Sequence, residues 1–197
     1  YLGDGDNGSI NRYDVTSPPS FAGWFGGITS PPTGPASGGP AGCTGATGYT
    51  PGWCLGGGSA YSDTVKLDGY FTHSSSGHGM NLWGDSTYLY ATDHTGHRVL
   101  KFKLSDGSYI GWFGKIATQP TGGDPGCTSA SVGALTPGWC RGGSTSTGSG
   151  ATGFSTPSGL SGVVTANGHT YLYVANLGTH NLLKFNATTG QVTGWRG

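Results

Sequence analysis

The chain has 197 residues, including 41 Gly and 11 Pro, and its nine acidic residues balance its nine Lys and Arg residues. The basic residues are scattered singly, so no basic stripe is available for phosphates and we expect no nucleic-acid partner. No apolar run reaches the roughly 18 residues that a membrane-spanning helix needs, so we expect no membrane span. Six Trp, ten Tyr and seven Phe residues supply enough apolar surface for a folded core despite the Gly and Pro content.

Short alternating apolar runs, separated by turns that contain Gly or Pro, predict an all-β fold. Three segments align without a gap, and each passes from a Tyr through a turn with Asp or Asn to an alternating strand. The segments are residues 1–13, 90–102 and 173–185. Each is followed by a Trp, namely Trp24, Trp112 or Trp195, and the spacings of 88 and 83 residues give a period of about 85.

The last repeat shows what one unit contains. We expect four strands there, at residues 160–164, 171–175, 181–185 and 191–195. Tight turns such as Ser105-Asp106-Gly107 join neighbouring strands as hairpins, since Gly supplies the positive φ that they need. Four antiparallel strands per period is the organisation of a β-propeller blade.

The predicted fold is therefore all-β, with about three tandem four-stranded antiparallel blades and long insertions rich in Gly, Ser, Thr and Pro. The expected parts are a partial first blade (1–26), a disulfide-bearing insertion (27–68), a second blade (69–115), a second such insertion (116–150) and a third blade (151–197). Three blades cannot close a ring of the usual four to eight, and the chain starts at Tyr1. We expect a piece or protomer of something larger.

Several blocks carry a resemblance to a known family. Residues 88–102 (YLYATDHTGHRVLKF), residues 171–185 (YLYVANLGTHNLLKF) and the lead GFSTPSG at 153–159 resemble the blades of NHL-repeat β-propellers. His97 and His180 occupy equivalent positions, where the first repeat has Gly8, and this equivalence indicates a structural hydrogen bond copied from blade to blade. Some relatives of this family are lyases that hold a metal through histidines at the propeller centre, which makes a metal-dependent lyase a third hypothesis for this chain.

The four cysteines allow three disulfide pairings. Each repeat contains two, so local bridges Cys43–Cys54 and Cys127–Cys140 would serve both copies in the same way. No CxxC spacing supports a zinc site. Disulfides predict an oxidising, extracellular or cell-surface location. Two N-glycosylation sequons, at Asn7 and Asn186, suit that location, although plain turns are the simpler interpretation.

The TPGWC corners present two further candidates. Trp53 and Trp139 stand on these corners, where their indoles could stack on sugars or could be buried beside the disulfides. Exposure of the two rings decides between these interpretations.

No nucleophile or phosphate-binding motif occurs, and His73, His78, His94 and His169 lie in turns without a repeated acidic partner. We therefore expect no catalytic residues, no metal and no cofactor. The favoured hypothesis is a non-enzymatic, secreted structural repeat protein that self-associates through strand edges and head-to-tail contacts into a fibre, sheath or surface layer. The alternative is an extracellular propeller module that binds a glycan or a protein.

Overall fold

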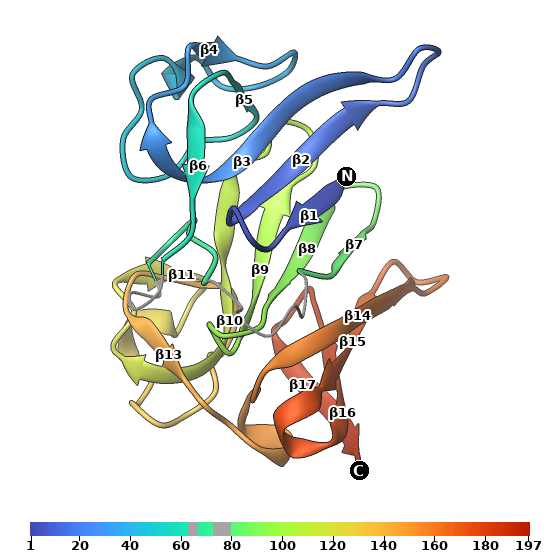
Figure 1. Cartoon of the computed structure of the whole chain (residues 1–197). Helices are drawn as coiled ribbons and strands as arrows, with labels where there is room; N and C mark the ends of the chain where they lie inside the picture. The colour runs from blue at the N-terminus through green and yellow to red at the C-terminus, as the bar shows by residue number, and fades with distance from the viewer. Residues whose placement is uncertain (63–66, 73–79) are drawn as a thin grey trace.

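The computed structural model of the chain describes residues 1–62, 67–72 and 80–197. These residues form β-strands and four single-turn 3-10 helices, with no α-helix among them. The strands make three antiparallel sheets, which lie in chain order from top to bottom in Figure 1. The prediction of an all-β fold built from antiparallel sheets is confirmed.

The N-terminal sheet has six strands, in the order β1-β2-β3-β5-β4, with β6 also pairing with β3. Its strands are β1 (Leu2–Asp4), β2 (Ser9–Asp14), β3 (Ser20–Ser30), β4 (Gly34–Pro35), β5 (Cys54–Leu55) and β6 (Gly58–Ala60). The strand β1 forms one edge of this sheet.

The middle sheet has seven strands, in the order β11-β12-β10-β9-β8-β7, with β13 also pairing with β10. Its strands are β7 (Leu82–Gly84), β8 (Tyr88–Asp93), β9 (Arg98–Lys103), β10 (Tyr109–Thr118), β11 (Gly122–Gly123), β12 (Cys140–Arg141) and β13 (Ser144–Ser146). The C-terminal sheet has four strands in sequence order: β14 (Pro157–Val164), β15 (Thr170–Asn176), β16 (Asn181–Asn186) and β17 (Gln191–Arg196). The four strands expected in the last repeat coincide with these to within a few residues.

The sequence repeat is also a repeat of strand register. The Trp of each repeat lies opposite the same aligned position of the preceding strand: Trp24 opposite Asn11, Trp112 opposite Leu100, and Trp195 opposite Leu183. The register then shifts at the same aligned place in all three sheets. On the preceding strand, this place lies between Arg12 and Tyr13, between Lys101 and Phe102, and between Lys184 and Phe185. A shared bulge position indicates that the three units bend and twist alike.

The two insertions extend their sheets. The expected boundaries after residues 26 and 115 fall inside β3 and β10, which continue to Ser30 and Thr118. The short strand that follows each TPGW sequence then returns to the same sheet and pairs with its long last strand, β5 with β3 and β12 with β10. The long loops are thereby tied to the outer edges of the N-terminal and middle sheets.

The core lies between the sheets. Successive residues of β8 and β9 alternate between its two faces, since Leu89 and Leu100 pack toward the N-terminal sheet while Tyr90 and Val99 pack toward the C-terminal sheet. Equivalent phenylalanine pairs join the sheets, with ring centroids 4.5 Å apart for Phe25–Phe102 and for Phe113–Phe185. The middle sheet is consequently buried on both faces.

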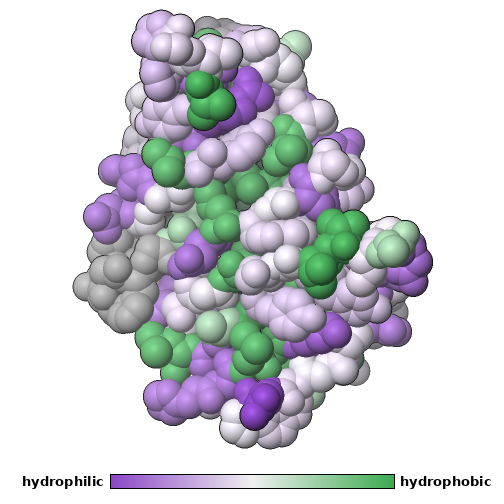
Figure 2. Space-filling model, turned by 90° about the vertical axis from the view of Figure 1, so that its right-hand side faces the viewer, coloured by the Kyte–Doolittle hydropathy of each residue, from purple (hydrophilic) through white to green (hydrophobic). Residues whose placement is uncertain are grey.

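The surface is mixed in character. On the face drawn in Figure 2, small groups of hydrophobic residues are separated by neutral and hydrophilic ones. Within the described ranges, no helix has the length and apolar character needed to cross a bilayer.

Candidate functional site

Both expected disulfides are present. Cys43 bonds to Cys54 and Cys127 bonds to Cys140, across 11 and 13 residues of sequence, and all four side chains are buried. Each bridge joins a single-turn 3-10 helix to the short strand next to the edge of its sheet, β5 or β12. We call residues 40–55 and 124–141 the first and second disulfide corners.

Of the two interpretations of Trp53 and Trp139, the structure supports burial beside the disulfides and not stacking on a ligand. Their exposed fractions are 0% and 1%, so neither ring presents a face to solvent. Each indole instead reaches from its corner to the next sheet. The Trp53 Nε1–H donates to the Leu104 carbonyl at 3.2 Å, and the Trp139 Nε1–H donates to the Ala187 carbonyl at 2.7 Å.

These two carbonyls occupy equivalent positions, because Leu104 begins the β9–β10 turn and Ala187 begins the β16–β17 turn. The first corner also touches its turn through backbone, since Trp53 N–H donates to the Asp106 carbonyl at 2.8 Å. Gly107 in that turn has φ +75°, and a Cβ there would lie 2.7 Å from the Trp53 ring. The close approach of corner and turn therefore requires glycine.

A cation lies against the aromatic rings at the aligned position of each repeat. The Arg12 guanidinium lies 5.5 Å from the centroid of the Trp53 ring, and the Lys184 Nζ lies 4.6 Å from that of Tyr171. Lys101 is the most enclosed of the three, with its Nζ 3.9 Å from the ring centroid of Tyr88. In the sequence, the repeated Leu-Lys-Phe of the second and third repeats carries this feature.

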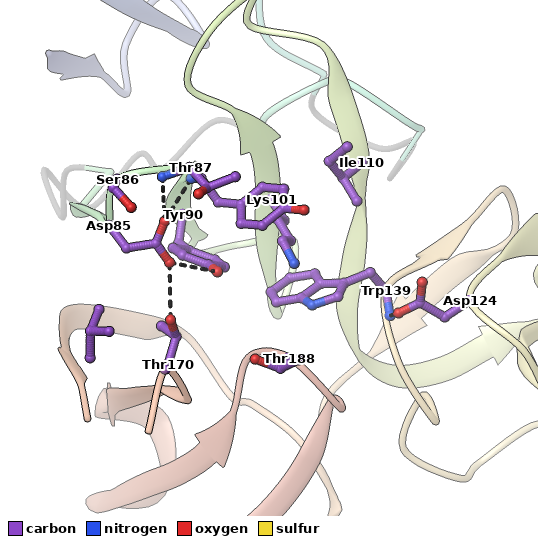
Figure 3. Close-up of a pocket in the computed structure, with 13 residues that line it drawn as sticks. Asp85, Ser86, Thr87, Tyr90, Lys101, Ile110, Asp124, Trp139, Thr170 and Thr188 are labelled. Atoms are coloured by element: carbon purple, nitrogen blue, oxygen red, sulfur yellow. Dashed lines mark hydrogen bonds between the residues drawn. The ribbon is translucent and has the colours of Figure 1, made fainter. Parts of the chain in front are cut away.

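A cleft of about 490 Å³ opens between the middle and C-terminal sheets beside Lys101 (Figure 3). The middle sheet and the second disulfide corner supply Asp85, Lys101, Asp124 and Trp139, and the C-terminal sheet supplies the turn residues on the opposite wall. We call this space the Lys101 cleft. It is a candidate site, because polar groups from several elements converge on it.

Asp85 is fixed in the wall of the cleft. Its Oδ1 accepts the backbone N–H groups of Thr87 (2.8 Å) and Tyr88 (2.7 Å). Its Oδ2 accepts the Tyr90 hydroxyl at 3.4 Å and the Thr170 hydroxyl at 3.1 Å, which joins the two sheets. All four bonds hold this carboxylate in the wall, as the dashed lines of Figure 3 show.

Burial lowers the pKa of Lys101 to about 8, because the charged ammonium loses water, and the carboxylates of Asp124 and Asp85 offset only part of that effect. Burial also raises the pKa of the Tyr90 hydroxyl well above its ordinary value, and the nearby Asp85 carboxylate adds to this shift. The cleft therefore contains an ammonium at neutral pH and a tyrosine that stays protonated.

The remaining predicted sites are dispersed. Asn7 is exposed in the β1–β2 turn, where its side-chain amide donates to Asp4 at 2.9 Å. Asn186 is only 8% exposed, and its Oδ1 accepts the backbone N–H of Thr188 at 2.8 Å. That carboxamide stabilises the β16–β17 turn, so only Asn7 lies ready for a glycan.

The repeated histidines have a backbone explanation. Gly8, His97 and His180 all have positive φ, of 62°, 54° and 52°, so the aligned position requires the left-handed conformation. His97 also accepts the backbone N–H of Thr156 at its Nδ1, at 3.2 Å. His73 and His78 lie outside the described residues. Within residues 1–62, 67–72 and 80–197, no three His, Cys, Asp or Glu side chains gather closely enough to hold a metal.

One buried ion pair escaped the sequence analysis. The Arg98 Nε donates to Asp93 Oδ2 at 2.8 Å, and both side chains are fully buried. The same guanidinium donates to the carbonyls of Leu67 (3.0 Å) and Tyr70 (2.8 Å). This pair fastens the segment 67–72 to the middle sheet. At the aligned positions, the first repeat has Asp4 and Ser9 and the third has Asn176 and Asn181.

Comparison with family models, with curated proteins and with solved structures finds no match to this chain.

Proposed function

We propose that the three sheets are blades of β-propeller type, akin to the NHL repeats that the sequence resembles. Three observations support this. The sets β7–β10 and β14–β17 are four-stranded antiparallel units, the register shift recurs, and consecutive sheets pack face to face. Within the described residues, the N-terminal sheet ends at β1, the counterpart of β8 and β15, and no strand matches β7 and β14.

We infer that the chain is a non-enzymatic structural repeat protein of an extracellular assembly. One observation carries this proposal: at both junctions a disulfide corner places its Trp on the hairpin turn of the next unit. Units that contact only their neighbours, each joined by the same device, form an extended scaffold that grows by addition. The two disulfides are compatible with an extracellular location.

The two ends of the stack favour self-association. Trp195 is 55% exposed, whereas the equivalent Trp24 and Trp112 are buried, because their sheets continue past β3 and β10 into a disulfide corner. Among the described strands, none pairs with the outer edge of β17 or with the free edge of β1. Unpaired strand edges are templates for another chain, and head-to-tail contacts that do not close produce filaments.

Sedimentation velocity and electron microscopy of the disulfide-bonded chain test this proposal. We expect oligomers that lengthen as protein concentration rises. Trp195→Lys, which places a charge on the β17 edge, should weaken them. Val132→Lys is the matched control, since Val132 is also an exposed apolar residue but lies in the second insertion. Monomers at every concentration, or equal weakening by both variants, would overturn the proposal.

A further inference from the structure

The Lys101 ammonium is the least satisfied group in the Lys101 cleft. The side chain is only 7% exposed, yet within the described part of the chain its Nζ contacts aromatic rings alone, with neither a hydrogen-bond acceptor nor an ion-pair partner. Figure 3 shows its amine end directed toward the space beside Trp139. The amine end lines the cleft, so its N–H donors are open to a ligand that brings a hydrogen-bond acceptor.

The charges of the cleft select among ligand classes. Lys101 contributes one positive charge, whereas Asp85 and Asp124 contribute two negative charges. An anion would gain the ammonium but would meet both carboxylates, and a cation would gain the carboxylates but would be repelled by Lys101. An apolar ligand would leave the ammonium without an acceptor. A neutral ligand rich in oxygen avoids all three costs.

The mouth of the cleft suits hydroxyl groups. Ser86 and Thr87 come from the β7–β8 turn and Thr188 from the β16–β17 turn, and all three side chains are exposed. A hydroxyl can both donate and accept, so these residues can exchange hydrogen bonds with a polyol. The volume of about 490 Å³ lies within the range of about 300–1,000 Å³ that is typical of small-molecule sites.

We propose that the Lys101 cleft binds a neutral saccharide, with a sugar oxygen accepting from the Lys101 ammonium and other sugar hydroxyls bonding to Ser86, Thr87 and Thr188. The two sheets would then grip the sugar from opposite sides. This site does not depend on the self-association proposed above, because the cleft is complete within one chain.

NMR titration of the isotope-labelled, disulfide-bonded chain with maltose, lactose and chitobiose tests the proposal, and glucuronate serves as the anionic counterpart. We expect at least one neutral disaccharide to shift the Lys101 side-chain and Thr188 backbone signals saturably. Lys101→Met keeps the aliphatic stem and should weaken binding about tenfold or more, because a hydrogen bond to a charged donor is lost.

Lys184→Met is the matched control, since Lys184 lies against tyrosines at the equivalent position but outside the cleft. Thr188→Val gives a second variant at the exposed rim and should weaken binding severalfold. Three results would overturn the proposal: no response to any of the neutral disaccharides, binding of glucuronate alone, or equal weakening by Lys101→Met and Lys184→Met.

Discussion

Replacing Trp139 with Phe tests whether the disulfide corner holds one sheet to the next. The indole is 1% exposed and packs against Phe113 and Phe185, with ring centroids 6.0 and 6.2 Å away. Phe keeps one aromatic ring in this position but removes the N–H group that bonds the carbonyl of Ala187. The substitution therefore isolates the anchoring contact more cleanly than truncation to Ala.

The expected cost has two parts. Ala187 is fully buried, so loss of the 2.7 Å hydrogen bond leaves its carbonyl without a partner, at about 1–3 kcal/mol. The missing part of the indole leaves a cavity, which adds about 1 kcal/mol on the scale of large-to-small core substitutions. A total of about 2–4 kcal/mol is a large fraction of the roughly 5–15 kcal/mol that stabilises a typical domain.

Urea unfolding followed by far-ultraviolet circular dichroism measures this cost. Trp195→Phe is the control, because it makes the same change of side chain at a Trp that is 55% exposed. It should change the free energy of unfolding by no more than about 0.5 kcal/mol. If Trp139→Phe and Trp195→Phe cost the same, the corner does not anchor the C-terminal sheet and the reasoning is refuted.

Three other predictions rest on separate contacts. Gly107→Ala should destabilise the chain by at least about 1 kcal/mol more than Gly133→Ala in thermal unfolding. Both glycines have positive φ, but only a Cβ at Gly107 would collide with the buried Trp53 ring. Between pH 8 and 10.5 the unfolded chain holds a proton on Lys101 that the folded chain has lost, so this residue makes stability rise with pH. Lys101→Met should flatten that rise in urea titrations from pH 8 to 10, and an unchanged slope would contradict the assignment. Peptide mass mapping after secretion from a eukaryotic host should find a glycan on Asn7 and none on Asn186; occupancy of Asn186 would show that its turn opens before modification.

Local features of this chain were readable from sequence. The four strands of the last repeat and the hairpin turns follow from alternation and turn chemistry, which act over a few residues, and the pairing of Cys43 with Cys54 follows from the repeat. The repeat of the histidine position is visible in the sequence, but its cause is a left-handed backbone conformation that Gly8 shares.

The contacts that give the chain its candidate function join residues far apart in sequence. The sequence allows Trp53 and Trp139 to serve a sugar-binding surface or a core, because the TPGWC corner does not reveal which way the indole turns. In the sequence, Lys101 is one of nine scattered basic residues. In the structure, β8, β9 and the second disulfide corner enclose its side chain.

The sequence by itself determined the all-β class, the period of about 85 residues and the disulfide pairs, because each is encoded in local pattern and repetition. Only the tertiary structure decided that the insertions extend the sheets, that the tryptophans anchor the next sheet, and that a cleft with an unpaired ammonium lies between two sheets. These features depend on which faces and turns of the sheets meet. Packing of the buried side chains decides this, because it joins residues that are 48 or more positions apart in the sequence.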